Sequence, residues 1–191
     1  MRKIILASQS PRRQELLKDI VNHFEICPSD VEEIVPDGIK TESVAEYLAT
    51  IKAEDVAKSH KGCVVIGSDT VVVVDDVILG KPNDREKAYQ MLSLLSGKVH
   101  KVITGCAIVC DDKKVSFSVE TKVEFFDLSD KDINEYIDTD DCYDKAGAYG
   151  IQSQGKTLVK SIEGDYYSVV GLPVARLKRE LDKFVDSVCL G

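Results

Sequence analysis

Residues 64–74 read Val64-Val65-Ile66-Gly67-Ser68-Asp69-Thr70-Val71-Val72-Val73-Val74. The β-branched runs at both ends predict buried β-strand, because such side chains suit a pleated backbone. The small and polar residues 67–70 predict an interruption between the two halves. A carboxylate within so apolar a segment is expected to be partly buried, where it needs a cationic or metal partner. Asp69 is therefore a candidate functional residue. The alternative is a structural aspartate hydrogen-bonded to a turn.

Helices are predicted on both sides of this segment. Residues 43–46 have the form of a capping box, and the apolar residues at 44, 48 and 51 that follow have helical spacing. Downstream, Asp75-Asp76 predicts a turn into a short strand over residues 77–79. Asn83 or Asp84 can then cap a helix that ends at Gly97.

A long hairpin sets the fold class. Residues 99–110 and 115–126 predict its two strands around a turn at residues 111–114, since apolar side chains alternate in the second strand. The resulting order is mixed α/β with an antiparallel hairpin, which disfavours the regular βαβ alternation of a doubly wound sheet. Further predicted elements are a strand over residues 4–7, a helix from Pro11 capped by Ser10, an irregular stretch over residues 25–40, a short helix from Ser129 to Tyr136 and a last helix opened by Pro173.

Composition and charge exclude some classes of function. The chain has 191 residues and a net charge of −8, which argues against a general nucleic-acid binder. An acidic protein can still hold a small anion in a local basic pocket. The apolar run at residues 4–7 is too short for a signal peptide, and no segment approaches a membrane span. We therefore expect a cytoplasmic protein with reduced cysteines, built as one domain or as one domain split into two lobes.

Several basic residues are candidates for binding an anion. Residues 8–13 read Ser8-Gln9-Ser10-Pro11-Arg12-Arg13, which places two arginines in the first turn of a helix, where the dipole favours negative charge. A bound anion would remove this conflict, and the alternative is two solvated arginines. Lys52, Lys81 and Lys145 are further candidates, although each also fits a surface lysine. The glycines at 147 and 150 predict a tight backbone path beside Lys145.

Two acidic residues complete the candidate site. Glu33 and Asp69, together with the cations, would suit a triphosphate bound with a divalent metal ion, because Mg²⁺ takes one or two carboxylates with phosphate oxygens and water. Neither a Walker A motif nor a dinucleotide-binding glycine motif is present.

A set of ordered segments resembles the Maf-like nucleotide pyrophosphatases. They span nearly the whole chain, and together they are specific, whereas any one alone would not be. The matching segments are residues 6–17, with the signature Ser8-Gln9-Ser10-Pro11-Arg12-Arg13, and residues 52–53, 67–72, 80–82, 95–97, 144–152 and 169–173.

The resemblance implies one Maf-like domain over residues 1–191, with a mixed-sheet, two-lobed fold related to inosine triphosphatases and the active site in a central cleft. It implies hydrolysis of a nucleoside triphosphate at the α–β bond, with Mg²⁺, Mn²⁺ or Co²⁺ as cofactor. Asp69 would accept a proton from water and share the metal with Glu33. The expected substrate-binding residues are Ser8, Arg12, Arg13, Lys52, Thr70, Lys81, Lys145 and Gln152.

Three positions bear on the substrate. Arg12, Thr70 and Gln152 are similar to the residues of the subgroup that acts on dTTP and UTP. This similarity implies that the substrates are pyrimidine nucleotides, modified ones included. It also implies a house-cleaning or cell-division-arrest role. Ser68 and Ser168 depart from the commonest family pattern, which has Ala and Asn there. The resemblance leaves a homodimer open and implies neither nucleic-acid nor membrane partners. The alternative is a nucleotide-binding regulator of septum formation without turnover.

Overall fold

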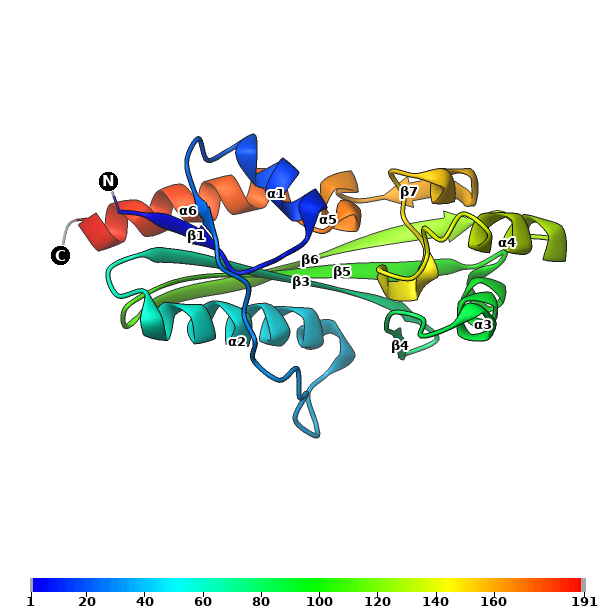
Figure 1. Cartoon of the computed structure of the whole chain (residues 1–191), viewed down its shortest axis with the longest axis horizontal. Coiled ribbons are helices and arrows are strands. Elements are labelled where there is room, and N and C mark those ends of the chain that lie inside the picture. Colours follow the sequence, from blue (N-terminus) through cyan, green and yellow to red (C-terminus); the bar gives the residue numbers. More distant parts are fainter. Residues whose placement is uncertain (1, 190–191) are drawn as a thin grey trace. The chain divides into compact units, whose positions relative to one another are not determined.

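The computed structural model describes residues 2–189 (Figure 1). Within this range helices and strands are mixed along the chain, and residues 27–40 form a long irregular stretch between β2 and the first 3-10 helix. The elements are β1 Ile4–Leu6, α1 Pro11–Lys18, β2 Glu25–Ile26, η1 Thr41–Ser43, α2 Val44–Ser59, β3 Val64–Val74, β4 Val77–Leu79, α3 Arg85–Leu95, β5 Val99–Cys110, β6 Lys113–Phe125, α4 Asp130–Ile137, η2 Ala146–Ala148, η3 Gln154–Thr157, β7 Val159–Glu163, α5 Tyr166–Val170 and α6 Val174–Cys189.

The strands form one mixed sheet in the order β2-β1-β3-β5-β6-β7, with β4 paired to β3. Strand β1 is parallel to both β2 and β3, whereas β4 is antiparallel to β3 and β7 is antiparallel to β6. Strands β5 and β6 are neighbours joined by Asp111-Asp112, which is the predicted hairpin. The predicted mixed α/β class is therefore confirmed.

The chain divides into two compact units. Unit 1 comprises the residues up to Asp69, Thr104–Val119 and the residues from Gly171 onward, and unit 2 comprises Thr70–Ile103 and Glu120–Val170. Each unit has its own apolar core. In unit 1, β1, β3 and β5 pack against α2 through small and β-branched side chains. In unit 2, α3 and α4 pack on the strands through residues such as Leu92, Phe125 and Ile137.

Helix α2 lies directly on the strands of unit 1 at two glycines. A Cβ atom at Gly67 would overlap the carbonyl oxygen of Ala49, and one at Gly105 would overlap the backbone of Ala45. Figure 1 shows α2 on one side of these strands and α6 on the other. Any larger residue at Gly67 would push the helix away from β3, so this position fixes the distance between them.

Two local predictions were wrong. Strand β3 runs without interruption through residues 67–70. Its register with β1 ends at Ile66, and β5 is its neighbour on the other side. Residues 43–46 form no capping box: Ser43 has helical backbone angles and makes no side-chain cap. The Glu46 carboxylate accepts a hydrogen bond from the Ser116 hydroxyl at 2.7 Å instead.

Other local predictions hold. The Ser10 hydroxyl accepts from the Arg13 N–H at the start of α1, Asp84 caps α3, and Ser129 caps α4 in a capping box with Asp132. Lys113, expected in the hairpin turn, begins strand β6, and its ammonium donates to the Ser187 carbonyl at 2.6 Å. No helix within residues 2–189 has the length and apolar character needed to cross a membrane.

His100 is a buried titratable group in the core of unit 2. Its side chain is almost fully enclosed, with the residue 1% exposed, and lies edge-on to Phe125 and Tyr149. Nε2 is 2.7 Å from the Tyr149 hydroxyl, and no described residue offers Nδ1 a hydrogen bond. Burial lowers the pKa of His100 to about 4. The folded protein therefore holds this imidazole neutral.

We expect His100 to make the fold acid-sensitive. Between the pKa of an unfolded histidine, about 6.5, and about 4, only the unfolded chain takes up this proton, so stability falls as the pH falls through that window. Between pH 7 and 5 this amounts to about 2 kcal/mol of unfolding free energy. Urea titrations at both pH values should show this loss in the wild type and in the exposed-site control His23→Gln, but not in His100→Gln. Equal pH dependence in all three proteins would contradict the assignment.

Candidate active site

Three predicted site residues of unit 1 meet in one ion-pair cluster. The Lys52 ammonium lies 2.6 Å from Asp69 Oδ1 and 2.9 Å from Glu33 Oε1. The side chains of Lys52 and Asp69 are 14% and 13% exposed, whereas that of Glu33 is 53% exposed. The expectation that Asp69 is partly buried with a cationic partner is thus confirmed.

The local sequence explains why these side chains meet. Alternate residues of a strand point to the same face, so Asp69 projects on the face where Gly67 leaves space for α2. Lys52 lies on α2 between Ala49 and Ala53, the two residues that pack against Gly67. The close approach of helix and strand therefore brings the ammonium to the carboxylate.

A second polar group lies around Ser68, which projects on the opposite face of β3. The Ser68 hydroxyl contacts the carbonyl oxygens of Gly105 and Gly171 at 3.0 and 3.1 Å. Arg13 donates from Nε to the same Gly171 carbonyl at 3.0 Å and from Nη1 to the Ser8 hydroxyl at 3.2 Å. Burial lowers the pKa of Arg13, and the charge of Asp69 opposes that shift. A guanidinium stays protonated in proteins, so Arg13 places a positive charge near Asp69.

The donor set suits a hard divalent cation. Two carboxylates, Glu33 and Asp69, converge on one positively charged atom, the Lys52 nitrogen. Mg²⁺ uses one or two protein carboxylates and takes its other ligands from phosphate and water. Within residues 2–189 no three His, Cys, Asp or Glu side chains gather as a metal cage. The pair therefore fits an ion bound together with a phosphorylated substrate better than a structural metal.

The predicted site residues of unit 2 have different surroundings. Lys81 is exposed just after β4, where the Gly147 N–H donates to the Gly80 carbonyl at 3.0 Å. Segments 80–82 and 144–152, both parts of the family pattern, are thus joined by a backbone hydrogen bond. Thr70 is half-buried on β3, and Gln152 is exposed in the turn after Ile151.

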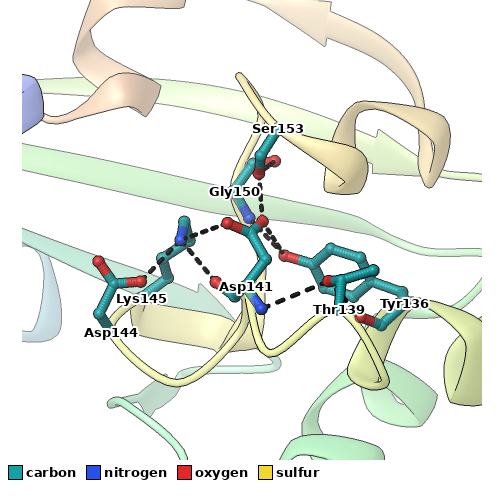
Figure 2. A network of polar contacts seen from close by, with 7 residues as sticks. All are labelled: Tyr136, Thr139, Asp141, Asp144, Lys145, Gly150 and Ser153. Carbon is teal, nitrogen blue, oxygen red and sulfur yellow. Dashed lines mark hydrogen bonds and ion pairs between the residues drawn. The ribbon is translucent and has the colours of Figure 1, made fainter.

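Lys145 is held by acidic neighbours, as Figure 2 shows. Its ammonium lies 2.5 Å from the Asp141 carbonyl, 2.9 Å from Asp141 Oδ1 and 2.6 Å from Asp144 Oδ1. An ammonium has three protons to donate, and these three acceptors match them. The geometry accordingly favours a role for Lys145 in holding Asp141 and Asp144 over a role in binding phosphate.

The centre of this network, Asp141, was not among the residues predicted from the sequence. Asp141 accepts from Lys145, from the Tyr136 hydroxyl at 2.8 Å and from the Ser153 hydroxyl. The available signal was the i,i+4 spacing of Asp141 and Lys145 beside a run of acidic residues. That signal is weak by itself, because most such pairs lie on solvated surfaces.

An α/β chain with a lysine-bridged carboxylate pair and an arginine beside it has the groups needed to bind a phosphorylated ligand with a metal ion. Comparison with known proteins specifies the class. The sequence model of the Maf-like protein family matches residues 3–184, and the chain belongs to this family.

Two curated relatives and one solved structure illustrate the relationship. A dTTP/UTP pyrophosphatase from Bacillus mycoides is 50% identical over 188 residues, which is 98% of each chain. A dTTP/UTP pyrophosphatase from Bacillus cereus is 48% identical over 184 residues, 96% of each chain. The structure of a HAM1 protein from Coxiella burnetii is similar with a TM-score of 0.51 and 16% identity, covering 96% of this chain and 100% of the other. This last likeness concerns the fold alone.

Proposed function

We propose that the protein hydrolyses dTTP and UTP to the monophosphate and pyrophosphate. The observation that carries the proposal is the cluster of Lys52, Asp69 and Glu33, which lies within the range that the family model matches. Two of its members, Lys52 and Asp69, stand in the segments that resemble the family. Relatives about half identical over nearly the whole chain carry the name dTTP/UTP pyrophosphatase, which supports the same substrates.

Asp69 is the proposed proton acceptor. Water attacks the α-phosphorus, its oxygen becomes part of the monophosphate, its proton passes to the Asp69 carboxylate, and the bridging oxygen leaves with pyrophosphate. Lys52 holds Oδ1 of Asp69 and so orients the carboxylate before the reaction. Partial burial strengthens this interaction relative to one in open water.

The cations offset the charge of the triphosphate. Arg13, Lys52 and Lys81 are proposed to neutralise phosphate oxygens, with the Ser8 hydroxyl orienting Arg13. A divalent ion, Mg²⁺, Mn²⁺ or Co²⁺, held by Glu33 and Asp69 would supply further positive charge there. Lys145, whose three donors already meet Asp141 and Asp144, is given no phosphate contact in this proposal.

Arg12, Thr70 and Gln152 are proposed to select the pyrimidine base. A site built to hydrogen-bond one base edge rejects another, because its polar groups then stay unpaired. Removal of unwanted pyrimidine nucleotides, modified ones included, is the role that this selectivity fits. A cytoplasmic location and a homodimer belong to the same proposal, and sedimentation analysis tests the dimer.

A panel of nucleoside triphosphates with each metal tests the function directly. We expect dTTP and UTP to be cleaved well ahead of dATP, dGTP and ATP, because one unpaired buried group already costs about tenfold in rate. Pyrophosphate and monophosphate should appear together, and ¹⁸O from labelled water should be found in the monophosphate. Label in the pyrophosphate would refute attack at the α-phosphorus. Binding without multiple turnovers would favour a nucleotide-binding regulator instead.

A further inference from the structure

Asp141 lies at the centre of a polar network that no catalytic step requires. Its Oδ1 accepts from Lys145, and its Oδ2 accepts from the hydroxyls of Tyr136 and Ser153 (Figure 2). Burial alone would raise the pKa of Asp141, but the hydrogen bonds from Ser153, Lys145 and Tyr136 outweigh burial and lower it. The carboxylate is therefore charged at neutral pH, and both of its oxygens accept hydrogen bonds.

Tyr136 ties this network to a rigid helix. The residue is buried on α4, whose neighbouring side chains Ile133 and Ile137 are in the core of unit 2. Its hydroxyl donates to Asp141 and accepts from the buried N–H of Gly150 at 3.0 Å. One phenol oxygen thus links the helix both to Asp141 and to the backbone of the 149–153 turn.

Lys145 holds the same turn from a second direction. A Cβ atom at Gly150 would overlap Cε of Lys145, so the lysine stem lies directly against the glycine. Its ammonium is bound to Asp141 and Asp144 at 2.9 and 2.6 Å. The tight backbone path predicted from the two glycines is explained here by the Lys145 side chain and, at Gly147, by Val72.

Gln152 is the exposed residue between two fixed points. Before it, Gly150 is bonded to Tyr136, and Ile151 is buried. After it, the Ser153 hydroxyl is bonded to Asp141. The backbone at Gln152 is therefore held on both sides while its amide side chain remains accessible to a ligand. An amide positioned in advance pays less ordering entropy on binding and discriminates better between hydrogen-bonding partners.

We propose that Asp141, Tyr136 and Ser153 are positioning residues that orient Gln152 and thereby set the preference for pyrimidine bases. This inference rests on the proposed function, because it assigns the network to the selectivity of that reaction. The three residues act through Gln152 and not on the phosphates. Their loss should therefore change which base is preferred, whereas a purely structural role would reduce all substrates alike.

Tyr136→Phe is the sharpest test, because it removes one oxygen and keeps the ring in the core. The ratio of kcat/KM for dTTP to that for dGTP should fall about tenfold, the effect of losing one well-formed hydrogen bond. The change should lie in the KM for dTTP, with kcat nearly retained. Gln152→Ala should lower the ratio at least as far. Tyr89→Phe is the matched control, since it removes a tyrosine hydroxyl bonded to Asp130 at 2.6 Å elsewhere in unit 2, and it should leave the ratio unchanged.

Ser153→Ala and Ser153→Thr give a second, conservative comparison. Alanine should lower the ratio, and threonine should restore it by returning the hydroxyl to Asp141. Amide hydrogen exchange at Gly150 should speed up in Tyr136→Phe but not in Tyr89→Phe. This measurement follows the hydrogen bond between Gly150 and the Tyr136 hydroxyl without any need for turnover.

The outcomes separate the two proposals. A wild type that cleaves neither dTTP nor UTP refutes the proposed function. In that event calorimetric affinities for dTTP and dGTP, measured without metal, still show whether Tyr136→Phe changes base preference. A pyrimidine-selective wild type whose ratio is the same in Tyr136→Phe and Ser153→Ala overturns the inference alone. Equal losses of kcat on every substrate would show that the network serves folding only.

Discussion

Asp69→Asn should fold normally and lose about 10²–10⁴-fold in kcat on dTTP, the usual contribution of a general base. The amide keeps the size of the side chain and can still accept from Lys52 through its oxygen. It cannot take a proton from water, and it removes one of the two negative charges that face Lys52 and that would hold the proposed metal ion. The fall should therefore appear in kcat more than in KM.

The control for this variant is Asp75→Asn. Asp75 is also paired with a lysine, Lys98, at 2.8 Å, but this pair is exposed to solvent in unit 2. Steady-state kinetics with pyrophosphate release as the readout should show a normal kcat in this control. Circular dichroism and thermal melting of both variants exclude a folding defect. A kcat near the wild-type value in Asp69→Asn would remove Asp69 from the catalytic role.

Much of the fold could be predicted because its signals are local. The cap at Ser10, the turn at Asp75-Asp76 and the alternation in residues 115–125 each depend on near neighbours in sequence. The interruption of β3 was predicted wrongly for the same reason. Local polarity at residues 67–70 favoured a break, but the segment is part of a continuous strand whose neighbours in the sheet are β1 and β5.

The candidate site depended on contacts that no local pattern reports. Burial of Asp69 followed from its apolar surroundings, and the structure supplies the partner, Lys52, 17 residues away along the chain. Their meeting depends on Gly67, whose missing side chain allows α2 to approach β3. The resemblance to the family marked both residues as functional without explaining the geometry. Asp141 was not identified because its partners, Tyr136 and Ser153, look unremarkable in sequence.

Lys52 should matter as much for catalysis as its partner Asp69. Lys52→Ala leaves two carboxylates, Asp69 and Glu33, facing each other without the cation that now bridges them. Truncating one partner of a partly buried charge pair is costly because the other charge stays behind. The proposed phosphate contact is lost as well.

We therefore expect kcat/KM for dTTP to fall about 10²-fold or more in Lys52→Ala, with a smaller loss in Lys81→Ala, since Lys81 is exposed. Lys113 is unsuitable as a control because its ammonium is bonded to the Ser187 carbonyl. The matched control is Lys61→Ala, because Lys61 is an exposed lysine of unit 1 just beyond the end of α2. This variant should behave like the wild type. Kinetics at several ionic strengths distinguish a general effect of charge from the loss of the bridge between Asp69 and Glu33. The fall in kcat/KM that comes from a general charge effect shrinks as salt screens it, whereas the fall that comes from losing the bridge persists. If Lys52→Ala, Lys81→Ala and Lys61→Ala behave alike, the bridge is not part of the catalytic site and the assignment of the phosphate-binding cations is wrong.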